Sequence, residues 1–322
     1  MIDFRYHVVS IVAVFLALAT GIVLGSTVLQ KPALETAQGA ASSLQQKNAD
    51  LRKQLLALQQ QQRASEGFAS ASAPKLLAGQ LTGKRVVVVA APGADGDAVD
   101  ALRKSVRQAG GSVTGTVSLK DGYVQQKQVG VLGGLTDTLA KNTKITLPGD
   151  AVPSERAAIL LAHALVTRDK TRLGKSDDVG DSILSTFKEA KFLSLDGAPQ
   201  NHANLALVVG PAQPYPAKGA SASNSAIVTL AKQLDVNGSG SVLAAPTASA
   251  GPDGVVASLR GDDDAKKRVS SVDNLDAPAG DVVSILALAL DGGGKVGQWG
   301  AGTGADGVAP TPTPAPVTSA TP

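Results

Sequence analysis

Residues 81–119 read LTGKRVVVVAAPGADGDAVDALRKSVRQAGGSVTGTVSL. Val86 to Ala90 is a continuous apolar run rich in β-branched residues, which is typical of a strand buried on both faces. Pro92-Gly93 breaks that run, and Asp97 is placed to cap a helix whose apolar residues recur every three or four positions. A glycine pair ends the helix, and Val113 to Leu119 predicts a second strand.

The same strand–helix–strand pattern returns later in the chain. A strand is expected over 203–211, a helix from Ser223 and another strand over 241–246, with helices between the two units over 153–168 and 181–193. A further apolar helix is expected to end at Asp291. Repeated units of this kind predict an α/β domain with a mostly parallel sheet, which we assign to residues 81–303.

The N-terminal region carries a long apolar segment. From Val8 to Gln30 there is no ionisable side chain, and a helix of this length crosses a bilayer core of about 30 Å. We therefore predict a transmembrane helix over 8–30, a cytoplasmic N-terminus over 1–7 and the bulk of the chain on the extracytoplasmic side. A cleaved signal peptide and a buried core helix are the alternatives. The apolar run continues through Ile22, Val23 and Leu24, Leu24-Gly25-Ser26 is a poor cleavage site, and the segment has no polar face.

A heptad pattern follows the apolar segment. Over 33–65 the positions at alternating spacings of three and four include Leu44, Asn48, Leu51, Leu55 and Leu58. This pattern predicts a coiled-coil stalk, and Asn at an a position favours a parallel two-stranded register. The alternative is a lone amphipathic helix that folds back onto the globular domain.

Small residues also recur on one face of the apolar segment, where Gly21 and Gly25 form a G-x-x-x-G pair that allows close helix approach in lipid. Both signals predict a parallel homodimer. Residues 66–80, which contain the small-residue stretch SASAP, are expected to be a linker. Residues 304–322 are expected to be a disordered Pro/Thr-rich tail, because such a composition cannot pack a core.

Composition excludes several classes of function. The 322 residues carry a net charge of +3 with both signs mixed throughout, which does not indicate a nucleic-acid partner. There is no Cys, so neither disulfides nor thiolate chemistry is available.

Motifs for catalysis are also missing. Gly302 to Gly307 matches G-x-G-x-x-G by letter, but a Pro-rich tail follows it where a dinucleotide site needs a helix. Asp95, Asp97 and Asp100 are interpreted as a helix cap and solvated charges, and the acidic and basic residues over 261–268 as a charged surface turn. We therefore predict no enzyme and no catalytic, cofactor-binding or metal-binding residue.

Three further polar features are interpreted as structural. Asp273-Asn274 and Asp276 are typical turn formers. His163, which lies among leucines, is expected to be a packed helix residue, and His202 a surface residue before a strand.

Several stretches resemble an actinobacterial envelope family, the mycobacterial copper transport protein B (MctB) family. They are Phe4-Arg5, His7 to Ser10, Val14 to Ala19, Gly21 to Ser26, Gly83 to Asp95, Val269 to Asp276, Pro278 to Gly280, and Val296 to Gly300 with Gly302. The resemblance covers nearly the whole chain except the tail. It implies copper efflux, with copper as the transported ion, through an outer-membrane channel.

The chain is also similar to SteB-type proteins, which implies a membrane-anchored partner of the cell-division machinery acting on a peptidoglycan hydrolase. Copper(I) prefers thiolate and thioether ligands, yet the only Met is Met1. A pore would need a closed barrel of alternating strands, whereas the predicted strands are buried apolar runs. The residues therefore favour a dimeric scaffold that acts through contacts with an envelope or division protein.

Overall fold

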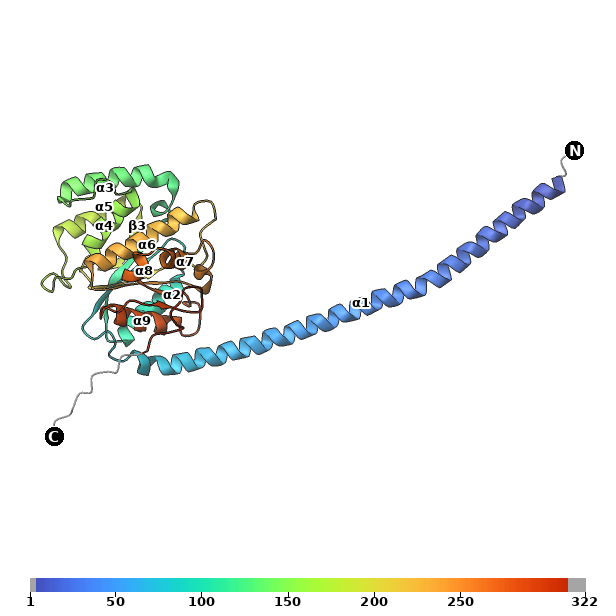
Figure 1. Cartoon of the computed structure of the whole chain (residues 1–322), viewed down its shortest axis with the longest axis horizontal. Helices are drawn as coiled ribbons and strands as arrows, with labels where there is room; N and C mark the ends of the chain where they lie inside the picture. The colour runs from blue at the N-terminus through green and yellow to red at the C-terminus, as the bar shows by residue number, and fades with distance from the viewer. Residues whose placement is uncertain (1–3, 312–322) are drawn as a thin grey trace, which may run out of the picture. The chain divides into compact units, whose positions relative to one another are not determined.

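The computed structural model describes residues 4–311, without the side chains of residues 27–38. These residues form two units that divide between Ala64 and Ser65. The first unit is a single helix, and the second is an α/β domain, as the strand–helix–strand pattern predicts (Figure 1). Residues 312–322 of the expected tail lie outside the described residues.

The elements follow one another as α1 (Phe4–Leu77), β1 (Arg85–Ala90), α2 (Gly96–Gln108), β2 (Ser112–Leu119), α3 (Val129–Thr143), α4 (Pro153–Leu165), α5 (Asp178–Glu189), β3 (Leu193–Gly197), β4 (Leu205–Val209), α6 (Ala220–Asn237), β5 (Ser241–Ala244), α7 (Val255–Gly261), α8 (Ala265–Arg268), β6 (Ser270–Val272), α9 (Gly280–Asp291) and β7 (Gln298–Trp299). Short 3-10 turns η1 (Asp121–Tyr123), η2 (Gln126–Gln128) and η3 (Thr247–Ala250) lie between them.

The sheet has seven strands in the order β3-β2-β1-β4-β5-β6-β7. All neighbours run parallel except β3, which pairs antiparallel with β2 at one edge. Strands β3, β6 and β7 are not among the predicted strands. They are short, and β3 begins where a helix was expected to end, because α5 stops at Glu189.

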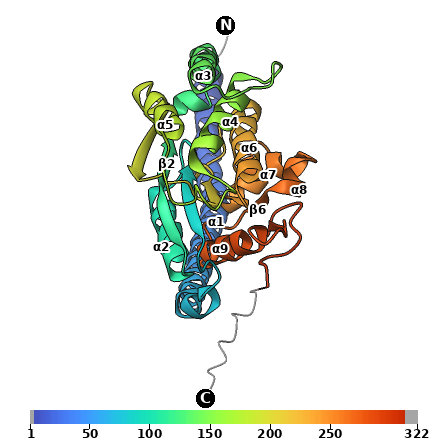
Figure 2. The same ribbon diagram turned by 90° about the vertical axis from the view of Figure 1, so that its left-hand side faces the viewer.

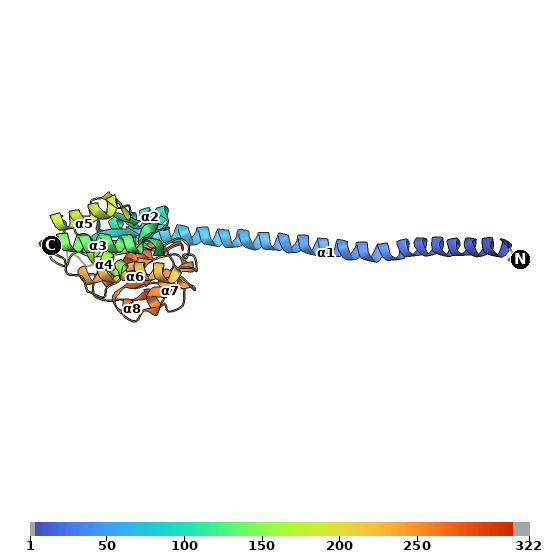
Figure 3. The ribbon, with the colours of Figure 1, turned by 90° about the horizontal axis from the view of Figure 1, so that it is seen from above.

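The two faces of β1 explain why its sequence is a continuous run of valines. Val87 and Val89 pack into the cluster that includes α3 to α7, and Val86 and Val88 pack into the cluster that includes α2 and α9. The sheet is therefore the middle of three layers (Figure 2). Helices α3, α4, α6 and α7 lie side by side on one face (Figure 3).

The last turns of α1 belong to the α/β unit. Ala73 and Leu77 pack into the cluster formed with α2 and α9, and Ala69 is also buried. The linker expected over 66–80 is thus helical as far as Leu77, because its small residues form a packing face.

Two further details correct the sequence prediction. The N-cap of α2 is Asp95, whose carboxylate accepts from the Asp97 amide at 3.0 Å, so Asp97 lies in the first turn of the helix instead. The expected tail from residue 304 begins with a packed segment, because the Gln298 amide donates to the Asp306 carboxylate at 2.7 Å and Gly307 bridges to Trp299.

Candidate functional site

The predicted dimerisation residues all lie on α1. Leu44, Leu51, Leu55 and Leu58 are between 57% and 63% exposed, and Asn48 is exposed as well. An added Cβ at Gly21 or Gly25 would meet nothing within 4 Å. These side chains are thus available to a second chain, and the dimer itself stays a prediction.

The N-terminal part of α1 has membrane length. Phe4–Ser26 spans 23 residues with a mean hydropathy of 2.6, which suits a membrane anchor or a signal sequence. The Thr20 hydroxyl donates to the Leu16 carbonyl and the Ser26 hydroxyl to the Val23 carbonyl. The polar groups inside the segment therefore bond back to the helix backbone, as a lipid environment requires.

A pocket lies between α2 and β2, where β1 and β2 end. Its volume is about 640 Å³, and its walls are the β1–α2 loop, the first turns of α2, the end of β2 and Asp196 of β3. In open α/β sheets, ligands bind outside the carboxyl ends of the strands, beside the point where the strand order reverses. Here the order reverses between β1 and β4, because α2 and α6 cover opposite faces, and the pocket lies on the β2 side of that point.

Charged side chains frame this pocket. Arg103 reaches Asp196 at 3.0 Å and Asp100 at 3.3 Å, while Lys120 and Asp121 lie at the end of β2. The Thr116 residue is only 4% exposed, and its hydroxyl has no hydrogen-bond partner within the described part of the chain. The pocket therefore combines donors and acceptors of both charges.

A second pocket of about 280 Å³ lies across the β1–α2 loop, between the N-terminus of α2 and the ends of β4 to β6. Its walls are mostly apolar, and it includes Asp95 and Asp276. Each of the two carboxylates already accepts hydrogen bonds within the chain. Asp95 accepts from the Asp97 amide, and Asp276 accepts from the Thr247 amide and hydroxyl at 2.8 Å.

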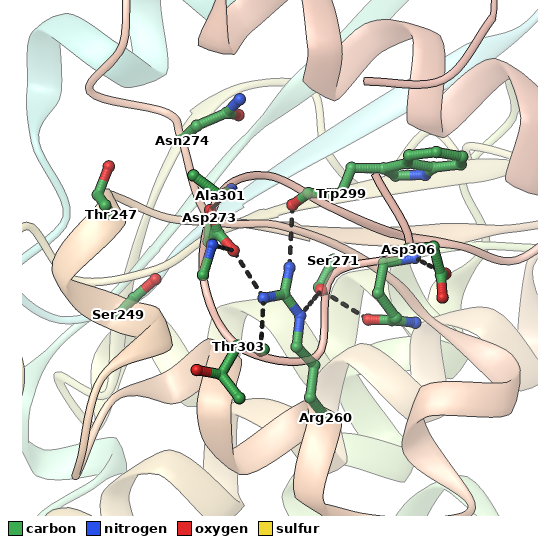
Figure 4. A network of polar contacts seen from close by, with 12 residues as sticks. Thr247, Ser249, Arg260, Ser271, Asp273, Asn274, Trp299, Ala301, Thr303 and Asp306 are labelled. Atoms are coloured by element: carbon green, nitrogen blue, oxygen red, sulfur yellow. Dashed lines mark hydrogen bonds and ion pairs between the residues drawn. The ribbon is translucent and has the colours of Figure 1, made fainter. Parts of the chain in front are cut away.

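A buried ion pair holds the C-terminal edge of the sheet (Figure 4). Arg260 of α7 donates to the Asp273 carboxylate at 2.6 Å, and the two side chains are 5% and 0% exposed. Arg260 also donates to the Ser271 hydroxyl and to the carbonyls of Trp299 and Thr303. Asp273 was interpreted as a turn former; the structure shows in addition that it is fully buried, with its charge paired inside the domain.

The G-x-G-x-x-G-like segment wraps this carboxylate. The amides of Ala301 and Gly302 donate to Asp273 at 2.8 and 3.0 Å. A Cβ at Gly300, whose φ is +133°, would lie 1.9 Å from the Asp273 Oδ1 atom. The glycines therefore let the backbone approach a carboxylate of the same chain.

A second buried carboxylate joins α9 to the sheet. Asp291 accepts from the Ser241 amide at 2.9 Å, and from the Ser270 amide at 3.0 Å and hydroxyl at 2.5 Å. Burial raises the pKa of Asp291 to about 7, although the hydrogen bonds from Ser270 and Ser241 favour the charged form.

The two histidines of the domain, His163 and His202, lie close together. His202 is fully buried, so its prediction as a surface residue is wrong. Its Nδ1 lies 2.7 Å from the Lys175 carbonyl, and its Nε2 lies 3.2 Å from the His163 carbonyl and 3.1 Å from Arg172. Burial lowers the pKa of His163. These contacts hold the loop before α5 against the start of β4.

No group of three or more His, Cys, Asp or Glu side chains suited to a metal ion occurs among residues 4–26 and 39–311, whose side chains are described. Sequence reasoning missed Arg260, because a single Arg in an amphipathic helix gives no local signal. The nearest hint was the turn former Asp273 together with the glycines near residue 300.

The geometry defines a class: an open, mostly parallel α/β domain that follows a long helix with a membrane-length apolar segment. The chain belongs to the MctB family, whose model, described as "Copper transport outer membrane protein, MctB", matches residues 1–310. This confirms the family resemblance of the sequence.

Relatives cover nearly the same length. The chain is 33% identical over 315 residues to proteins named Copper transporter MctB from Mycobacterium tuberculosis and Mycobacterium bovis, covering 95% of this chain and 98% of each relative. It is 32% identical over 327 residues to the protein of that name from Mycobacterium leprae, covering 96% and 99%.

Proposed function

We propose that this chain is a membrane-anchored, non-enzymatic envelope protein that works as a parallel homodimer and acts through contacts with other proteins. The observation that carries the proposal is the row of exposed leucines on α1. An isolated helix gains little from leucines in water, whereas a coiled coil buries them in a seam.

The row supports a two-stranded seam in register. Leu44, Leu51 and Leu58 occupy successive d positions, and Asn48 and Leu55 occupy a positions. Paired Asn48 side chains would hydrogen-bond across the seam and fix the register at a cost in stability. In a parallel dimer the Gly21 and Gly25 faces of the membrane segments would also meet.

Packing of the α/β unit limits how far the seam extends. Continuing the heptad places Ala69 at the next a position after Gln62, but Ala69 and Ala73 are 8% exposed within their own domain. Since the same face cannot pack against a second stalk, the proposed coiled coil ends before Ala69.

A charge substitution in the seam tests the dimer. Leu51→Lys with Leu55→Lys places four like charges in a two-stranded seam, so crosslinked dimers of the full chain in membranes should fall at least tenfold. The measurement is crosslinking yield at fixed protein level.

The matched control is Leu56→Lys with Ala57→Lys. Leu56 is 60% exposed, as Leu55 is at 59%, but the pair occupies b and c positions away from the seam. Dimer yield should stay at the wild-type level. Equal loss in both variants, or none in either, would reject the heptad assignment.

Copper transport is the second candidate, favoured by the name of the relatives that match this chain over nearly its full length. The chain lacks Cys and has Met only at position 1, so it offers no thiolate and only one thioether for copper(I). We propose that any copper passes through an assembly that includes this protein, without a tight site of its own.

A deletion strain separates copper transport from the remaining alternative, regulation of a peptidoglycan hydrolase at division. Copper sensitivity with normal septa supports transport. Chained or misdivided cells with normal copper tolerance support the division role and remove copper transport from consideration.

A further inference from the structure

We infer that the pocket between α2 and β2 binds a neutral polyhydroxylated ligand of one or two sugar rings. The inference is independent of the dimer and rests on the polar groups that line this pocket.

The pocket wall carries free groups of both charges. The Lys120 ammonium and the Asp121 carboxylate have no ion-pair or hydrogen-bond partner within the described part of the chain, and the Ser118 hydroxyl lines the wall between them and Thr116. A sugar hydroxyl donates to a carboxylate and accepts from an ammonium or hydroxyl group at the same time. Such a ligand satisfies both kinds of group without adding net charge.

Two buried polar atoms in the pocket wall are unsatisfied. The Thr116 hydroxyl and the Arg103 Nε atom are both shielded from water and have no partner among the residues that the structure describes. Leaving a buried polar atom unpaired is costly, so such atoms in a pocket wall indicate a missing partner. Both residues line the pocket, so a ligand bound there would supply the partner.

Size and charge exclude the nearest competitors. A volume of about 640 Å³ lies in the range of small-molecule sites, and a single amino acid would leave most of it empty. Phosphorylated ligands are disfavoured because Asp100, Asp121 and Asp196 line the pocket and the Asp95 carboxylate already caps α2. A neutral polyol meets neither obstacle.

The pairing of β2 with β3 places several polar side chains on one face of the sheet. Thr116 pairs with Asp196 across β2 and β3, and Ser118 pairs with Ser194, so these small polar side chains share one face of the sheet. Helix α2 packs its apolar residues against the cluster around β1, and Arg103 reaches over to Asp196. The hydroxyl-bearing part of the sheet is therefore open to a ligand.

The test uses the full chain in detergent micelles and three probes: maltose, cellobiose and N,N′-diacetylchitobiose. Titration calorimetry and saturation-transfer NMR should show binding of at least one probe at millimolar concentration. Thr116→Val, which keeps the side-chain shape, should weaken that binding about tenfold and leave the unfolding temperature unchanged or higher. The Thr114→Val variant, two residues earlier in β2 and outside the pocket wall, should bind as the wild type does.

The source of the sugar is distinguished by cosedimentation with insoluble cell-wall polysaccharide. Binding to both the probe and the polysaccharide assigns a wall glycan, and binding to the probe alone assigns a free sugar. Absence of any probe binding at 10 mM would overturn the inference. A marked fall in unfolding temperature of Thr116→Val without ligand would also overturn it, because the hydroxyl would then have a partner in the protein.

Discussion

Leu51 of α1 and Val87 of β1 belong to the same class of residue, yet 57% of Leu51 is exposed and Val87 is completely buried. In the α/β domain every strand finds its apolar partners within the same chain, and even the buried charges of Arg260 and Asp273 are paired there. The stalk has an apolar row of similar regularity, but its leucines are exposed and meet no partner among the residues that the structure describes. The contrast between a packed domain and an exposed stalk favours the proposal that the stalk forms half of an interface.

Breaking the buried ion pair between Arg260 and Asp273 should have the largest effect on the free energy of unfolding. Arg260→Met leaves the Asp273 carboxylate buried without its cation, which costs about 3–5 kcal/mol of unfolding free energy. Urea denaturation followed by Trp299 fluorescence measures the change.

The control for that experiment is Arg268→Met. Arg268 pairs with Asp264 at 2.8 Å, but both side chains are about half exposed, at 49% and 56%. Water screens an exposed ion pair, so the midpoint should hardly move. A small effect of Arg260→Met would mean that the Asp273 charge is satisfied by the loop amides alone.

The second prediction concerns pH. The pKa of Asp291 is raised to about 7 by burial, so between pH 4 and 7 the folded state holds a proton that the unfolded chain releases. The contribution of Asp291 to stability is therefore present below its ordinary pKa and is lost as pH rises, by up to about 1.4 kcal/mol per pH unit. Asp291→Asn, which resembles the protonated carboxyl, should flatten this decline.

Asp264 provides the opposite case for comparison. Hydrogen bonds from Lys232 and Arg268 lower the pKa of Asp264 to about 2, so its contribution is present above its ordinary pKa and lost on acidification. Asp264→Asn should leave the decline between pH 4 and 7 intact. If Asp291→Asn keeps the wild-type slope in urea titrations, Asp291 is ionised throughout.

The smallest effect is expected in the stalk. Asn48→Leu replaces the polar a position, so it should stabilise a coiled coil by about 0.8 kcal/mol for each methylene that the seam buries. It should also permit oligomers larger than the dimer, because the paired Asn side chains no longer select two strands. Analytical ultracentrifugation in detergent measures both changes, and an unaltered mass with unaltered stability would place Asn48 outside the seam.

The fold was predictable where the pattern is local. The valines of β1 and the helix after them define a parallel α/β unit, and the unbroken apolar run near the N-terminus defines the membrane-length helix. Strands β6 and β7 were not predictable, because runs of three and two residues carry no periodicity. Their position depends on the long-range pairing of Arg260 and Asp273.

The candidate sites were predictable only in part. The heptad leucines follow from spacing alone. The pocket beside Thr116 and the burial of His202 depend on which strands become neighbours, and a single sequence does not encode that locally. The acidic residues after β1 illustrate the limit. A helix cap was predicted there, but at Asp97, whereas the residue that caps α2 is Asp95.

The loop around Asp273 has a practical consequence. Trp299, the single tryptophan of the chain, lies on β7 and gives its carbonyl to Arg260. Tryptophan emission from the intact protein therefore originates at one rim of the sheet and not from α1. Loosening of that rim can be followed by fluorescence in the full chain, with no label attached and with α1 intact.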